Sequence, residues 1–286
     1  LSGKNELKGG KARIYQIIEV APFRQYHLSA WIKTENLHSQ EKINHKITSL
    51  SGQPISFSDW DVRKNQEWTQ YHTLFNSQNN TQLRFNIGVL QGRKEGKIWI
   101  DDVAMEETGI LNPIRRLGCP LTVRGEDGSS YREGRDYDLI RVNKQGTTGR
   151  HEAYQQSHLI KLLPGSKINE GKRLRISYHH AVSTNKGKQT ICLTETKGDQ
   201  FLHQDIENID KLLKPKGLFL NYSDIRVANW CDTCRSRNMS PGNLLADHFK
   251  RTKKFINTLD SRQRIFVWSD MFDPYHNAVD HYYLVN

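Results

Sequence analysis

Three carboxylates follow three predicted strands in the C-terminal part of the chain. Glu195, Asp224 and Asp270 each come after a short run of aliphatic and aromatic residues. Because the carboxyl ends of parallel strands meet on one face, we expect these side chains to share a cleft. Glycosidic hydrolysis needs one acid that protonates the leaving oxygen and a second carboxylate at the oxocarbenium-like centre. We therefore predict Asp224 as the general acid, with Glu195 and Asp270 positioning or stabilising charge.

Polar and aromatic side chains accompany these carboxylates. A sugar subsite combines aromatic rings with a few placed donors and acceptors. The residues that we predict for substrate contact in this region are Arg226, Trp230, Trp268, Asp273 and His276. Structural alternatives remain open, because an Asp at a strand end can cap the following helix and Arg226 can simply pair with a carboxylate. His276 has the alternative of a solvated loop position.

The elements that must position these groups follow from the hydrophobic pattern. Strands are expected near 190–195, 218–224 and 265–270. Apolar spacing of three to four predicts helices over about 198–213 and after Ser240-Pro241. This β-α-β-α-β order indicates parallel strands with crossover helices. Since a closed barrel needs eight such steps, we expect a partial (β/α) TIM-type barrel over 184–286 and a piece of a longer protein.

The N-terminal part has a different pattern, which predicts an all-β jelly-roll sandwich over 1–108. Short aromatic-rich runs with period two are separated by Gly, Asn and Ser clusters. The expected strands are 14–18, 26–33, 42–47, 69–75, 83–89 and 97–103. Trp60 lies in a polar segment and is predicted to stack on sugar, with a place at the core edge as the alternative. Trp31 and Trp99 are expected in the core.

Residues 109–183 show weaker patterns and are predicted to form a small β region or linker between the two larger parts. Short apolar runs near 120–128, 159–163 and 173–178 indicate strands there. Gly128 and Gly134 fit turns rather than a phosphate-binding loop, because no phosphate-loop spacing accompanies them.

Charge and hydropathy exclude several classes of protein. The chain has 286 residues with 42 Lys and Arg against 31 Asp and Glu, a formal net charge of +11. A basic excess favours anionic partners, but no nucleic-acid-binding signature accompanies it, so we expect no nucleic-acid partner. No apolar run approaches the roughly 20 residues of a membrane span. The first residues lack the pattern of a signal peptide.

Four cysteines are too few for a disulfide scaffold. Cys231 and Cys234 form one C-x-x-C. A structural zinc usually needs four ligands, and no second C-x-x-C or H-x-x-x-H accompanies this motif, so we predict no metal and no cofactor. Thioredoxin-like chemistry would place the motif at a helix start. Here it is expected in a loop, as two cysteines packed together or disulfide-bonded.

Two resemblances refine these predictions. The segments 26–34, 68–71 and 96–103 (Tyr26 to Thr34, Trp-Thr-Gln-Tyr, and Gly-Lys-Ile-Trp-Ile-Asp-Asp-Val) resemble CenC-type carbohydrate-binding modules. The resemblance covers about 11–107. It implies a jelly roll of the kind joined to polysaccharide-degrading enzymes.

The segments Ser223 to Cys231 and Val267 to Pro274 resemble bacterial glycoside hydrolase-like proteins whose barrel is similar to that of the family 20 hexosaminidases. The resemblance covers about 110–286. That family carries an Asp-Glu pair that falls on Ser223 and Asp224 here, so the orienting carboxylate is replaced. The resemblance implies hydrolysis of a polysaccharide and a secreted, periplasmic or cell-surface location. The alternative is a non-catalytic carbohydrate-binding or cell-surface protein.

Overall fold

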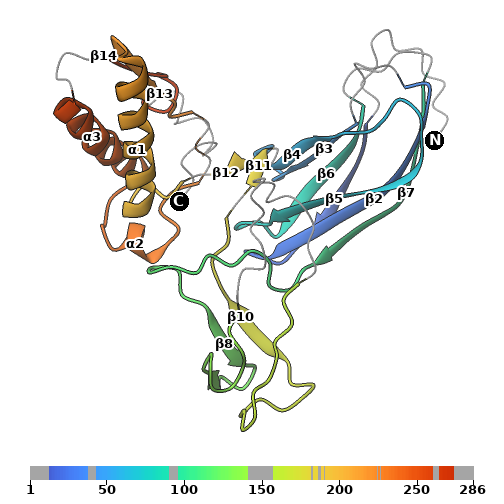
Figure 1. Cartoon of the computed structure of the whole chain (residues 1–286). Helices are drawn as coiled ribbons and strands as arrows, with labels where there is room; N and C mark the ends of the chain where they lie inside the picture. Colours follow the sequence, from blue (N-terminus) through green and yellow to red (C-terminus); the bar gives the residue numbers. More distant parts are fainter. Residues whose placement is uncertain are drawn as a thin grey trace. The chain divides into compact units, whose positions relative to one another are not determined.

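The computed structural model describes most of the chain (Figure 1). The described residues are 13–37, 43–89, 96–140, 157–181, 183–185, 188–189, 191–223, 225, 227–259 and 264–273. They belong to two compact units. Unit 1 comprises Leu1–Pro113, Tyr131–Lys172 and His180–Gln189, and unit 2 comprises Ile114–Ser130, Arg173–His179 and Thr190–Asn286.

Unit 1 contains two β-sheets. Its strands are β1 (Arg13–Glu19), β2 (Gln25–Glu35), β3 (Ile43–Thr48), β4 (Pro54–Trp60), β5 (Gln66–Asn76), β6 (Gln82–Val89), β7 (Lys97–Glu107), β11 (Ser183–Asn185) and β12 (Lys188–Gln189). One sheet has the order β1-β6-β3-β4-β11-β12 and the other the order β5-β2-β7. The pairs among β1 to β7 are antiparallel, and all six strands predicted before residue 108 are confirmed.

The core of unit 1 lies between these sheets. Side chains of a strand alternate between its two faces, so one set of β2 can be buried while the other stays outside. The inward set is Leu28, Ala30 and Ile32, which are fully buried. They belong to the same cluster as Ile43 and Leu83 of the opposite sheet. An antiparallel sandwich therefore holds its core through the alternation that the sequence shows.

The sugar-stacking prediction for Trp60 is wrong, and the alternative of a core position is confirmed. The polar segment around it is strand β4, and Trp60 is only 6% exposed. Its indole Nε1 donates to Thr73 Oγ1 at 3.2 Å, and its ring stacks on Tyr71 with centroids 5.8 Å apart. A buried tryptophan gains apolar burial while its N–H finds an acceptor, which is why the core position is favoured.

Unit 2 combines helices with short strands. Its elements are β8 (Thr122–Gly125), β10 (Leu174–Ser177), α1 (Thr196–Leu213), β13 (Gly217–Leu220), α2 (Asp232–Arg235), α3 (Pro241–Leu259) and β14 (Arg264–Val267). Strands β8 and β10 pair antiparallel, and β9 (Ser130–Tyr131) belongs to the same sheet. Both predicted long helices are confirmed, and the Ser240 hydroxyl accepts the Asn243 N–H as an N-cap does. Among the described residues, no helix is long and apolar enough to cross a membrane.

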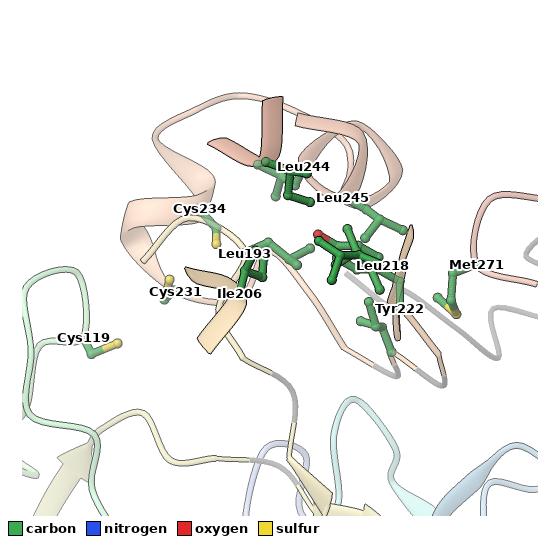
Figure 2. Packing of buried hydrophobic residues seen from close by; sticks show 13 residues of the cluster. Cys119, Leu193, Ile206, Leu218, Tyr222, Cys231, Cys234, Leu244, Leu245 and Met271 are labelled. Atoms are coloured by element: carbon green, nitrogen blue, oxygen red, sulfur yellow. The ribbon is translucent and has the colours of Figure 1, made fainter. Parts of the chain in front are cut away.

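Strands β13 and β14 form a parallel pair, as predicted, with Gly217 opposite Arg264 and Leu220 opposite Val267. Leu218 and Leu220 are buried in one cluster with helix residues. Figure 2 shows Leu218 near Leu244 and Leu245 of α3. The packed face of this pair is therefore covered by helices, the arrangement that a βαβ crossover produces.

The prediction of a strand near 190–195 is wrong. The described residues 191–195 form a turn before α1, in which the Glu195 N–H donates to the Cys192 carbonyl at 3.2 Å. The nearby strand β12 ends at Gln189 and pairs antiparallel with β11. Within the described ranges, β13 and β14 are the parallel pair of unit 2, and a TIM-type barrel is not shown.

Buried His45 makes unit 1 sensitive to acid. It is 0% exposed in β3, and neither ring nitrogen has a partner in the described part of the chain. Burial lowers the pKa of His45 from 6.5 to about 4, although the nearby Asp59 carboxylate opposes this shift. Below pH 6.5 the unfolded chain binds a proton that the folded chain does not. Stability present above pH 6.5 is therefore lost as the pH falls towards 4.

We expect this loss to reach about 3 kcal/mol, the value of a pKa difference of this size. Urea unfolding followed by tryptophan fluorescence from pH 7.5 to 4.5 measures it. In His45→Leu the fall should be smaller, whereas His158→Leu, which changes a histidine outside the core, should keep it. Equal pH dependence of the parent and His45→Leu would contradict this role.

Candidate functional site

One of the predicted carboxylates, Asp270, meets Ser223 where the chain leaves the parallel strands β13 and β14. The Ser223 hydroxyl donates to Asp270 Oδ2 at 3.5 Å. The other oxygen, Asp270 Oδ1, is buried and has no hydrogen-bond partner among the described residues. The N–H groups of Phe272 and Asp273 both donate to the Ser269 carbonyl, so a tight turn holds Asp270. A buried acceptor without a partner normally has a reason, and at a ligand site the ligand supplies the donor.

The other residues predicted for the region after β13 and β14 fall into two groups, those that the structure describes and those that it does not. Asp224, Arg226 and His276 lie outside the described residues, so their roles stay predictions. Trp230 is half-buried, and its carbonyl accepts a hydrogen bond from His179 Nε2 at 3.2 Å. Asp273 is half-buried in the turn after β14.

Trp268, which the sequence predicts as a substrate contact, has an exposed ring. It is 55% exposed and packs edge-on against Phe219, with ring centroids 5.0 Å apart. Both rings lie on the face of the β13–β14 pair opposite the buried Leu218 and Leu220, because strand residues alternate between faces. The open face of this pair is therefore aromatic.

Glu195 has a structural position. Its carboxylate accepts the Lys197 N–H at 3.4 Å as the N-cap of α1. The same carboxylate forms an ion pair with Arg116, at 2.8 Å between Oε2 and Nη1. This is the helix-capping alternative for a predicted strand-end acid. The sequence led to the catalytic prediction because residues 190–195 looked like a strand.

The sequence prediction missed an aromatic surface on unit 1. Trp31 and Trp99, expected in the core, lie on the outer face of the β5-β2-β7 sheet, and Trp68 lies there as well. Trp68 is 42% exposed and Trp99 is 38% exposed. Trp31 is half-buried and alternates with the inward residues Ala30 and Ile32.

Strand pairing assigns the three rings to one face. Lys33 lies opposite Trp99, and Trp31 lies opposite both Gln70 and Asp101. Directly paired residues of antiparallel strands project to the same side, and so do residues two apart on one strand, which places Trp68 with Gln70. We call the outer surface of Trp31, Trp68 and Trp99 the tryptophan face. The alternation in β2 contained this signal, since Trp31 is out of phase with the buried set.

The cysteines form a cluster in unit 2. No disulfide is present, and Cys231 is the N-cap of α2 rather than a loop residue. The Cys192 sulfur lies 3.7 Å from that of Cys231 and 3.5 Å from that of Cys234. A hydrogen bond with the Cys231 thiol lowers the pKa of Cys192 to about 4, with further bonds to Thr194 and despite burial. The same hydrogen bond and burial raise the pKa of Cys231.

Comparisons with solved structures give partial likenesses, two of which are described here. No protein-family model matches the sequence, and no curated protein matches it. One partial likeness is to a CBM4 structure that is 16% identical in sequence, with a TM-score of 0.28. The match covers 34% of this chain and 61% of the CBM4 chain. Another is to the enzymatically active domain of tailspike protein 4 from bacteriophage CBA120, which is 15% identical, with a TM-score of 0.27. The match covers 37% of this chain and 17% of the tailspike chain. The chain thus spans less than two thirds of either neighbour.

We expect Glu195→Ala to destabilise unit 2, because it removes both the N-cap of α1 and the ion pair with Arg116. A lost cap costs about 1 kcal/mol, and a partly exposed ion pair adds up to about 1 kcal/mol. Thermal unfolding of the variant measures the loss. The control is Glu207→Ala on the same helix, which removes the exposed pair with Lys211 and an exposed 3.5 Å contact with Gln204, and should cost less than about 0.5 kcal/mol. Equal losses of thermal stability in the two variants would contradict the capping role of Glu195.

Proposed function

We propose that this protein binds a polysaccharide through the tryptophan face of unit 1. The carrying observation is that Trp31, Trp68 and Trp99 share the solvent side of one sheet. The outer face of an antiparallel sheet is ordinarily polar, so a group of large aromatic rings there indicates a binding surface.

The surface suits sugars more than a protein partner. Tryptophan offers a broad apolar ring face, against which the C–H face of a pyranose can pack. Gln70, Lys33 and Asp101 lie among the rings and supply donors and acceptors for hydroxyl groups. Trp68 and Trp99 flank β2 on its two sides, so they are about 10 Å apart across two strand spacings. A linear chain of linked sugars can bridge such a span.

Removing one flanking ring should weaken binding. We expect Trp68→Ala and Trp99→Ala each to lower the affinity for a bound polysaccharide by about tenfold or more, a loss of about 1.4 kcal/mol. Affinity electrophoresis in gels that contain soluble polysaccharides identifies the ligand, and titration calorimetry gives the affinity. Tyr15→Ala is the matched control, since Tyr15 is an exposed aromatic residue on β1 of the other sheet. Equal losses in all three variants would contradict a site on the tryptophan face.

A second function, hydrolysis of the glycosidic bond, is favoured by the position of Asp270. We infer that Asp224 protonates the leaving oxygen, as the sequence predicts. Asp270 faces the developing positive charge with its unpartnered oxygen Oδ1, while Ser223 holds Oδ2. Trp268 offers an exposed ring for the sugar at this edge.

Hydrolysis is tested by the release of reducing ends from a polysaccharide panel. We expect Asp224→Asn and Asp270→Asn to lower turnover by about 10²–10⁴-fold, the usual contribution of one acid or base group. Asp205→Asn, the same chemical change on an exposed position of α1, should leave it unchanged. If the parent binds through the tryptophan face but releases no sugar from any panel member, the protein is a non-catalytic carbohydrate-binding protein.

A further inference from the structure

All four cysteines of the chain converge in unit 2. They come from three segments that are far apart in sequence. The thiol sulfurs of Cys192, Cys231 and Cys234 all lie within 4.8 Å of one another. Cys119 is buried in the same cluster and its thiol interacts with the Cys231 thiol, but its sulfur lies outside the group of three that are within 4.8 Å of one another. Cys119, Cys231 and Cys234 are buried in the hydrophobic core, and Cys192 packs against it.

We propose that Cys119, Cys192, Cys231 and Cys234 hold one structural zinc ion. Four sulfurs placed tetrahedrally at about 2.3 Å from zinc are about 3.8 Å from one another. The 3.7 Å and 3.5 Å separations of Cys192 from Cys231 and Cys234 are close to this value. A disulfide needs a sulfur separation of about 2.05 Å, so two sulfurs at nearly equal distance from a third describe a ligand set better than a bonded pair.

The backbone brings Cys119 to the cluster by a close approach. The Asp232 N–H donates to the Gly118 carbonyl at 2.9 Å, which joins the loop before Cys119 to the start of α2. A Cβ on Gly118 would clash with Thr233 Oγ1, and the residue has φ +76°. Only glycine accepts this conformation and this contact without strain. Gly118 is therefore what allows the first cysteine to reach the C-x-x-C.

Backbone and hydroxyl donors surround the sulfurs, as expected around metal-bound thiolates. The Cys234 N–H bonds to the Cys231 sulfur, and the Thr194 N–H bonds to the Cys192 sulfur. The Thr194 hydroxyl lies 3.0 Å from the Cys234 sulfur. Figure 2 shows the sulfurs of Cys231 and Cys234 directed towards each other.

One cation, Arg116, lies beside the cluster and offsets part of its charge. Zinc with four thiolates carries two net negative charges, which need compensation in a buried position. Arg116 Nη2 donates to the Cys231 sulfur at 3.5 Å and its Nη1 contacts Glu195 at 2.8 Å. The guanidinium thus lies between the cluster and the N-cap of α1.

Binding converts four thiols into four thiolates, so one Zn²⁺ enters and up to four protons leave to solvent. No oxidant or reductant takes part. The ion would close the long loops between Cys119, Cys192 and Cys231 in the folded state, which stabilises unit 2 independently of any carbohydrate function.

Metal analysis of the purified full chain tests the proposal. After expression with zinc and dialysis, we expect one zinc per chain by mass-spectrometric elemental analysis, with no iron. Cys119→Ser, Cys192→Ser and Cys234→Ser should each lose most of this zinc. Ser236→Ala is the matched control, because it removes a hydroxyl from the exposed end of α2 that bonds to Thr233 and should retain the zinc.

A measurement on the parent chain does not depend on how the variants fold. Titration with an organic mercurial should release one zinc, seen with a metal-sensitive dye, as four thiols react. Cobalt(II) in place of zinc should give the charge-transfer absorption of thiolate ligands. A metal-free chain with four freely alkylated thiols, a chain about 2 Da lighter because of a disulfide, or iron in place of zinc would each overturn the proposal. Polysaccharide binding by the tryptophan face is measured in a separate experiment, so the zinc proposal and the proposed function can each fail without the other.

Discussion

Each sheet that carries a candidate site has one face committed to a core, and this constraint decides which side chains remain for ligands. In β2 the inward set of Leu28, Ala30 and Ile32 fills the sandwich, so Trp31 must face outward. In the β13–β14 pair Leu218 and Leu220 pack under helices, which leaves the opposite face to rings such as Trp268. In both units, the exposed aromatic residues thus lie on the sheet face opposite the one that packs in the core.

Strongly periodic elements could be predicted from the sequence, and weakly periodic ones could not. Helices α1 and α3 carry long apolar stripes, and β2 and β6 alternate clearly, so their types were predicted correctly. Strand β4 was missed because buried Ser56 fills an inward position that a hydrophobic residue usually fills. The strand prediction for residues 190–195 failed because apolar residues there are not buried in a sheet. Ile191 and Leu193 alternate as in a strand but lie in the turn before α1.

The site residues divide in the same way. Asp224 and Asp270 are predicted at neighbouring strand ends because parallel strands fix where their ends lie, and this rule needs only the order of elements. The contact that the structure shows is made by Ser223, the residue before Asp224, and the sequence did not predict it. The cysteine cluster needed more. A search for ligand pairs close in sequence finds Cys231 and Cys234 but not Cys119 and Cys192, whose approach depends on a loop docking at Gly118. Convergence of distant segments depends on tertiary packing, which spacing along the chain does not contain.

The cysteine cluster and the β13–β14 edge are connected through one short segment. The chain from Tyr222 to Cys231 carries Ser223 and the predicted acid Asp224. Its first residue is fixed by the Tyr222 hydroxyl, which lies 2.9 Å from His248 Nδ1 inside the core, and His248 in turn contacts Asp199 of α1. Its last residue is fixed by the cysteine cluster. Side chains that must be held within a fraction of an ångström need such support from neighbours that do not touch the substrate. A zinc ion at Cys231 would therefore act as an anchor within unit 2, by holding the end of the segment that carries Ser223 and the predicted acid Asp224.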